Sequence, residues 1–463
     1  MSEEMKTLRK QLLRDSRSGY DVLEEAQLRE MEDYCADYKA FLGNKTERLS
    51  ARAAIAAAKA HGFVEYRRGM ALEAGDKVYT CNRGKGLMLA VMGRESMAEG
   101  VQIAAAHIDS PRLDLKPNPL YEDSELAYFK THYYGGIRKY QWVTIPLQLQ
   151  GVVVKKDGTA VEVCIGEKGE PQLVITDLLP HLGGEQGKKP LSEAIPAETL
   201  NILLGSRPIG DEDDSDRVKL HVMKRLYDKY GITEADFASA ELEAVPAAAA
   251  VDIGIDGSMI GSYGHDDRVC GYAALRALLE LDAPAKTAVC VLADKEEIGS
   301  MGVTGMQSAV FETFLSDLCD SQNVPLKVCF ENSFCLSADV TAAYDPNFAD
   351  VFDKKNAAFL NHGVGLCKYT GARGKSGSSD AGAETVAYVR SLLDGADVRW
   401  QICELGKVDA GGGGTVAQYM ANRNIATLDA GVPVLSMHAP FEVVAKLDCY
   451  EMYRACKAIY EAR

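Results

Sequence analysis

Five residues of types that bind metal ions come just past apolar, strand-like runs of the sequence: His107, Glu296, Glu297, Asp339 and His438. In open α/β sheets, ligands bind at the carboxyl ends of the strands. Imidazole nitrogens and carboxylate oxygens gathered in one place form a donor set for divalent cations. The pattern therefore predicts a metal site at one edge of a sheet.

The pair His107 and Asp109 forms an H-x-D motif after the run Val101–Ala106. Residues two apart on a strand face the same way. His107 could therefore bind a metal while Asp109 orients it. Taken alone, the motif equally suits a strand end at which Asp109 binds the next turn.

Two pairs of adjacent carboxylates are further candidates. Glu296 and Glu297 follow the apolar run Thr287–Ala293, where paired acids are costly unless a cation or proton compensates them. One could hold a metal while the other acts as general base on water. In H-D-D-R, Asp266 or Asp267 could bridge two cations. The alternatives are an exposed acidic turn for the glutamates and a helix N-cap for the aspartates.

Together with Asp339 and His438 as terminal ligands, these residues suit two borderline divalent cations, with zinc first and cobalt or manganese as alternatives. Such pairs clamp an attacking water and a scissile carbonyl in two-metal hydrolases. The sequence has no G-x-S-x-G, P-loop or H-E-x-x-H motif. Gly412 and Gly413 belong to a glycine run without the lysine of a phosphate loop. We interpret this run as backbone close to substrate, with a flexible turn as the alternative.

The elements that must position these residues alternate between strand and helix patterns, which predicts an α/β fold with a mixed sheet flanked by helices. Expected helices include Ala51–Ala60 capped by Ser50, Gly271–Leu281 and Gly305–Leu318, and the apolar run Cys329–Ala338 leads to Asp339. Between residues 113 and 245 the pattern changes to short strand-like pieces with a K-D-G-T hairpin signal. We therefore expect a discontinuous catalytic domain, 1–112 and 246–463, interrupted by a β-rich domain, 113–245.

The composition excludes several classes of function. The 463 residues include 51 Lys plus Arg and 67 Asp plus Glu, for a formal net charge of −16. An acidic chain of this kind fits neither a nucleic-acid binder nor a protein docked on anionic lipid. The sequence shows no membrane-spanning run and no secretory signal. Its 12 cysteines are scattered, without a C-x-x-C pair, which predicts reduced thiols and a cytoplasmic location.

Five motifs taken together resemble the aspartyl aminopeptidase family of dinuclear zinc metallopeptidases, in its bacterial form. They are A-A-H-I-D-S-P-R, H-D-D-R-V-C-G-Y-A-A-L-R-A-L, D-K-E-E-I-G-S, S-A-D-V-T-A-A-Y-D-P-N-F and S-M-H-A-P-F-E, in the family order. The resemblance implies metal ligands His107, Asp266, Glu297, Asp339 and His438, with Asp266 bridging and Asp339 opposite Glu297. It also implies that Glu296 is the general base and that Asp109 orients His107.

The resemblance further implies that residues 113–245 form a dimerisation domain and that dimers assemble into a tetrahedral dodecamer acting on peptides. His181, in I-T-D-L-L-P-H-L, matches a histidine that reaches the partner's active site, where it would stabilise an oxyanion. A surface-loop histidine is the alternative.

The sequence departs from acid-preferring family members in the segment around Thr341. Ala342 and Asp345 stand where those members have histidines, although Lys368 matches a lysine near the substrate pocket. Lys368 or Arg373 could pair with an acidic first residue, whereas Asp345 would disfavour one. We therefore expect a zinc aminopeptidase that removes single N-terminal residues from peptides, with acidic residues among the candidates. The alternatives are a di-zinc amidohydrolase of small N-acyl substrates and a non-catalytic assembly protein with structural metals.

Overall fold

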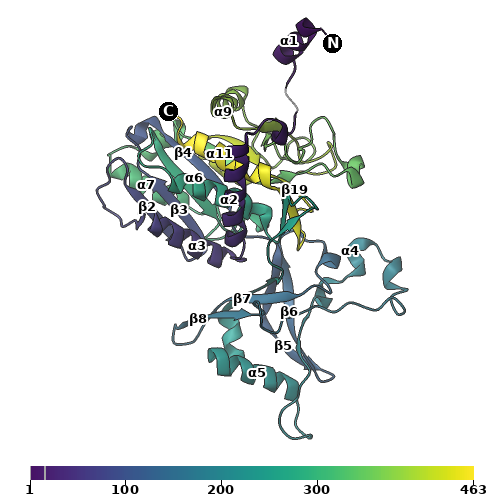
Figure 1. The fold of residues 1–463 in the computed structure, drawn as a ribbon. Helices are drawn as coiled ribbons and strands as arrows, with labels where there is room; N and C mark the ends of the chain where they lie inside the picture. Colours follow the sequence, from purple (N-terminus) through teal and green to yellow (C-terminus); the bar gives the residue numbers. More distant parts are fainter. Residues whose placement is uncertain (1, 15–16) are drawn as a thin grey trace.

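The computed structural model describes residues 2–14 and 17–463 and shows two lobes joined by extended strands (Figure 1). The upper lobe is built around a nine-stranded mixed sheet with the order β1-β2-β3-β13-β4-β14-β18-β16-β17. These strands are β1 (Val64–Glu65), β2 (Lys77–Asn82), β3 (Gly86–Val91), β4 (Val101–His107), β13 (Thr287–Ala293), β14 (Phe334–Ala338), β16 (Val364–Cys367), β17 (Trp400–Ile402) and β18 (Ala426–Gly431).

The four central strands, β13, β4, β14 and β18, are parallel to one another. Their carboxyl ends therefore meet at one edge of the sheet, and β13 and β4 are in register from Thr287↔Val101 to Ala293↔His107. Strand β4 is buried on both faces because Ile103 and Ala105 join one apolar cluster while Ala104 and Ala106 join the other. Continuous apolar runs are what parallel strands covered on both faces require.

Helices cover both faces of this sheet. The helices that supply buried residues to the cluster on one face are α2 (Glu25–Phe41), α3 (Glu47–Ala60), α6 (His265–Leu279), α9 (Ala383–Gly395) and α11 (Lys446–Tyr460). On the opposite face they are α7 (Val310–Asp320), α8 (Leu326–Glu331) and α10 (Val416–Ala421). Helix α1 (Glu3–Leu12) has no buried residue. This mixed α/β architecture confirms the predicted fold class.

The lower lobe contains an antiparallel six-stranded sheet with the order β8-β7-β10-β5-β6-β9. All of its strands come from residues 112–246: β5 (Arg112–Asp123), β6 (Leu126–Tyr134), β7 (Leu147–Val154), β8 (Ala160–Ile165), β9 (Ile202–Gly205) and β10 (Ala240–Pro246). Helices α4 (Leu191–Ala194) and α5 (Arg217–Tyr230) belong to the same segment. The sequence patterns did not indicate α5. We call residues 113–245 the inserted segment.

A small third sheet, with the order β11-β12-β20-β19-β15, lies beside the large one. Its strands are β11 (Val251–Ile253), β12 (Met259–Ser262), β15 (Thr341–Ala342), β19 (Pro433–Leu435) and β20 (Glu442–Ala445). Strand β15 comes shortly after β14 along the chain, so this sheet continues from the carboxyl edge of the large sheet.

Some predicted boundaries were wrong. Helix α3 begins at Glu47 rather than Ala51, because Thr46 caps it by accepting from the backbone N of Leu49, and Ser50 instead donates to the carbonyl of Asn44. Helix α6 begins at His265 rather than Gly271. The start of α7 is later than expected, at Val310. The run Cys329–Ala338 is divided between the end of α8 and strand β14.

A buried cluster of charges lies where the two lobes join. Arg112 at the start of β5 contacts Glu47 and Glu243, each at 3.3 Å, and its guanidinium lies 3.9 Å from the ring centroid of Tyr134. Burial opposes ionisation of Glu47, but Arg112 and Lys85 keep its pKa below the usual value. Buried charges are stable only when paired in this way.

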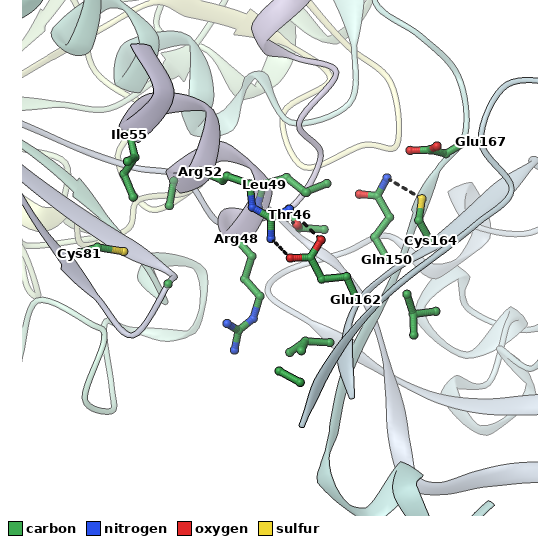
Figure 2. Close-up of a pocket in the computed structure, with 16 residues that line it drawn as sticks. Thr46, Arg48, Leu49, Arg52, Ile55, Cys81, Gln150, Glu162, Cys164 and Glu167 are labelled. Carbon is green, nitrogen blue, oxygen red and sulfur yellow. Dashed lines mark hydrogen bonds and ion pairs between the residues drawn. The ribbon is translucent and has the colours of Figure 1, made fainter. Parts of the chain in front are cut away.

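A cavity of about 510 Å³ lies between helix α3 and the β7–β8 hairpin (Figure 2). A bidentate ion pair between Arg52 and Glu162 crosses it, and Gln150 contacts Cys164 on its far wall. None of the predicted site residues lines this cavity. It is therefore separate from the site described next.

Ten of the 12 cysteines are buried and the other two are half-buried, and all are free thiols. This agrees with the prediction that most of the cysteines are buried. Within the described part of the chain, no helix is both long and apolar enough to cross a membrane.

Candidate active site

The carboxyl edge of the large sheet gathers the predicted metal-binding residues. His107 is the last residue of β4, Asp339 directly follows β14, and a 3-10 helix after β13, η7 (Glu296–Ile298), carries both glutamates. Asp266 lies in the first turn of α6, and His438 lies in the turn between β19 and β20. All of these except the fully buried His107 line one cavity of about 580 Å³, which we call the main cavity.

Asp266 lies between the two imidazoles. Its Oδ1 is 3.2 Å from Nε2 of His107, and its Oδ2 is 3.1 Å from Nε2 of His438. A carboxylate that presents one oxygen to each of two histidines has the arrangement of a bridging ligand for two cations. The H-D-D-R motif left open which of its two aspartates could bridge two cations. In the structure, Asp266 is the one whose carboxylate lies between the two histidines.

The other carboxylates divide between the two histidines. Asp339 Oδ1 is 3.8 Å from Nε2 of His107, and Glu297 Oε2 is 3.6 Å from Nε2 of His438. Glu296 Oε2 is 3.9 Å from Nε2 of His107. His107 therefore lies near Asp339, Glu296 and one oxygen of Asp266, whereas His438 lies near Glu297 and the other oxygen of Asp266.

The chemistry of this donor set fits divalent cations. Glu297 Oε1 is buried and has no hydrogen-bond partner among the described residues. A buried carboxylate oxygen without a donor is costly unless a cation or proton compensates it. Potential ligand atoms form two groups, and within each group the atoms lie within 4.8 Å of one another. One group is His107, Asp266 and Glu297, and the other is His107, Asp267 and Asp339. Asp267 is thus an additional neighbour that our predicted ligand set omits.

Asp109 holds several parts of the site in place. Its backbone carbonyl lies 2.9 Å from Nδ1 of His107, which directs Nε2 toward Asp266. Its buried carboxylate accepts hydrogen bonds from the backbone N of Glu296 at 3.2 Å and of Glu297 at 3.3 Å. It also accepts one from the hydroxyl of Tyr134 at 2.8 Å. Asp109 therefore connects the histidine of β4 to the glutamates of η7.

Three residues that sequence reasoning missed contact these groups. Tyr134 and Gly136 belong to the inserted segment, and the carbonyl of Gly136 accepts from Nδ1 of His438 at 2.8 Å. Glu442 accepts from the backbone N of His438 at 2.7 Å and of Asp266 at 3.2 Å. Glu442 ends the S-M-H-A-P-F-E motif and was open to prediction, whereas no pattern indicated the other two.

The carboxylates of the site raise the pKa of both histidines, and burial raises the pKa of Glu296. Burial raises the pKa of Glu296 to about 7, with Asp109 and Asp266 adding to the effect. Although burial lowers the pKa of His438, the carboxylates of Asp266 and Glu297 raise it to about 11. Burial also lowers the pKa of His107, but Asp109 and Asp266 raise it well above its usual value. The carboxylates that raise the histidine pKa values would likewise stabilise bound cations.

Other predicted site residues lie elsewhere. Gly412 and Gly413 line the main cavity. Lys368 and Arg373 are exposed and do not line it, and Asp345 lines a neighbouring cavity. His181 is exposed on the inserted segment and does not line the main cavity of its own chain.

Comparisons with known proteins identify the family of the chain. A family model described as aminopeptidase I zinc metalloprotease (M18) matches residues 43–460. The probable M18 family aminopeptidase 1 of Clostridium acetobutylicum is 48% identical over 450 residues, covering 95% of this chain and 97% of that protein. Its counterpart from Thermotoga maritima is 44% identical over 439 residues, covering 93% and 96%.

Solved structures have the same fold. The crystal structure of the M18 aminopeptidase of Thermotoga maritima has a TM-score of 0.93 at 42% identity, covering 97% of this chain and 99% of that one. The mApe1 dodecamer of S. cerevisiae has a TM-score of 0.74 at 21% identity, covering 93% and 98%. The chain belongs to the M18 family of zinc aminopeptidases. It is a metallo-aminopeptidase, a hydrolase that acts on peptides, as the motifs predicted.

Proposed function

We propose that this aminopeptidase holds two zinc ions and removes single neutral residues from the N-terminus of peptides. The observation that carries the proposal is the position of Asp266, with one carboxylate oxygen toward each of the two histidines. His107 and Asp339 would complete one metal site, and His438 and Glu297 the other. When bound, the cations would polarise the scissile carbonyl and lower the pKa of a water molecule.

In this proposal Glu296 is the general base. Its carboxylate lines the main cavity, and no metal-binding role is needed for it, because the other carboxylates supply the ligands. It would accept a proton from the attacking water and pass it to the leaving amine. Asp109 would keep His107 and η7 oriented through the hydrogen bonds described above. Gly412 and Gly413 would allow the substrate backbone to lie close to the wall.

A neutral first residue suits the walls of the main cavity. None of the described residues that line it is lysine or arginine, and its histidine, His438, is a proposed metal ligand, so no free basic side chain of the cavity would pair with an acidic substrate. Its walls beyond the metal-binding groups include Thr341, Cys367, Thr370 and the buried carboxylate of Asp429. Lys368 and Arg373, the candidates for acid recognition, are exposed outside it. The same lack of a basic side chain disfavours N-acyl amino acids, whose free carboxylate needs a cation.

We further propose that residues 113–245 mediate dimerisation within a cytoplasmic dodecamer in which His181 acts in the partner's site. The exposed position of His181 is compatible with this role. The dodecamer described for mApe1 supports the assembly, and the unpaired cysteines support the location.

The test compares Glu296→Gln with wild type on aminoacyl-amide substrates with Asp, Glu, Leu or Lys as first residue. We expect Leu to be preferred, the variant to lose about 10²–10⁴-fold in turnover, and both proteins to bind two zinc ions per chain by elemental analysis. Glu331→Gln, an exposed glutamate at the end of α8, is the control and should behave as wild type. Full activity of Glu296→Gln would refute the assigned base, and preference for Asp would refute the neutral pocket.

A further inference from the structure

A second cavity of about 610 Å³ adjoins the metal-binding cluster on the side of His438. Gly136, Met437 and His438 line both this cavity and the main one, so the two meet at a predicted metal ligand. The remaining walls come from residues 138–141 of the inserted segment and from residues 342–352 and 434–436. We call it the second cavity.

Large apolar side chains stand open to solvent around the second cavity. Phe348 is 62% exposed, Val351 is 47% exposed and Tyr140 is 41% exposed, and all three line it. Grouped exposed apolar side chains next to a hollow mark a binding surface. Apart from the predicted metal ligand His438, the charged residues of its wall are Arg138 and Asp345, one of each sign, so these two charges balance. An apolar, uncharged group is therefore the ligand that fits it best.

The distribution of reactive groups assigns a direction to a bound peptide. Asp266, Glu296, Glu297 and Asp339 all line the main cavity, and none of them lines the second one. The first residue of a substrate, with its free amine, belongs among those carboxylates. The rest of the peptide must lead away from the scissile bond in another direction, and the second cavity begins at His438.

We propose that the second cavity binds the side chain of the residue that follows the scissile bond, and that it favours large apolar side chains. This inference rests on the proposed function, because it requires the scissile bond to lie at the metal-binding cluster. Phe348 and Val351 form the contact surface on one side, and Tyr140 from the inserted segment forms it on the other. The enzyme thus selects its substrate on both sides of the bond that it cleaves.

The test uses the zinc-loaded enzyme and three substrates, Leu-amide, Leu-Gly-amide and Leu-Phe-amide. Leu-amide releases only ammonia and does not reach the second cavity. We expect kcat/KM for Leu-Phe-amide to exceed that for Leu-Gly-amide by roughly tenfold, as partial burial of an aromatic side chain would give. The double variant Phe348→Ser/Val351→Ser should reduce this ratio to about twofold or less, mainly by raising the KM for Leu-Phe-amide. Its turnover of Leu-amide should stay unchanged.

Ile255→Ser is the matched control, because Ile255 is fully exposed and lines neither cavity. It should keep the wild-type ratio. An unchanged ratio in the double variant would overturn the inference. If the assembly size changed at the same time, the apolar surface would be assigned to contact with a second copy of the chain. Failure of wild-type enzyme to cleave any of the three substrates would instead overturn the proposed function, and the inference with it.

Discussion

The hydroxyl of Tyr134 is a sensitive point of the site, and Tyr134→Phe isolates it. The substitution keeps the aromatic ring that lies 3.9 Å from the Arg112 guanidinium and removes only the donor to Asp109. At 2.8 Å this is the shortest of the hydrogen bonds that the Asp109 carboxylate accepts. Oδ2 would keep only the 3.3 Å bond from the backbone of Glu297.

The expected cost follows from the burial of Asp109. Its side chain is fully buried, so water does not replace the missing donor. A hydrogen bond to a charged group contributes about 1.5–3 kcal/mol, and we expect the free energy of unfolding to fall by that amount. Loss of a group that orients a metal ligand typically reduces metal affinity about 10–100-fold. Because Tyr134 acts on His107 through Asp109, we expect the lower end, about tenfold.

Two measurements check this expectation. Urea unfolding of the metal-free protein reports the change in stability, and competition with a zinc chelator reports the change in affinity. Tyr133→Phe is the control, because Tyr133 is the adjacent residue of β6 and is 41% exposed. It should match wild type in both measurements. Wild-type zinc affinity and stability in Tyr134→Phe would refute the idea that the inserted segment holds the site through Asp109.

Three further outcomes are expected. Glu442→Gln leaves only one acceptor oxygen for the backbone N–H groups of His438 and Asp266. Zinc affinity measured by chelator competition should therefore fall about tenfold, and an unchanged affinity would contradict this. Burial lowers the pKa of Lys45 to about 8 in the folded protein, whereas it is roughly 10.4 in the unfolded chain. Between about pH 8 and roughly pH 10.4 the unfolded chain therefore binds more protons than the folded one, and the free energy of unfolding should rise with pH. Urea unfolding should show this rise in wild type but not in Lys45→Met. His181→Ala should keep the assembly and lose rate, and mixed oligomers with Glu296→Gln should recover activity, whereas no recovery would argue against action across subunits.

Much of the architecture was predictable because strand runs and metal-binding residues are local signals. The buried runs that end at His107 and before Glu296 are continuous in sequence, and they became neighbouring parallel strands. The placement of Asp339 followed from the rule for strand ends, whereas His438 comes from the turn between β19 and β20 of the small third sheet. Helix starts were less predictable: Thr46 and Ser50 are both good N-caps, and tertiary contacts decided between them.

The supporting contacts were not predictable because they join distant parts of the chain. The hydrogen bond between Gly136 and His438 spans 302 residues, and it uses a backbone carbonyl that any residue type would supply. Tyr134 belongs to a strand in which buried and more exposed residues roughly alternate, where a buried tyrosine needs no functional explanation. Lys368 was predicted near the substrate pocket from its residue type alone, and its side chain is exposed and does not line the main cavity.

The contacts of Tyr134 and Gly136 affect how this protein can be divided. An engineered chain that replaced residues 113–245 with a short linker would retain all of the predicted metal ligands. It would nevertheless lose the donor to Asp109 and the acceptor of His438, two supports that arrive from the far lobe. The insertion is therefore not an interchangeable module. Recombination that exchanged it between relatives would have to preserve a tyrosine and a tight loop at this junction.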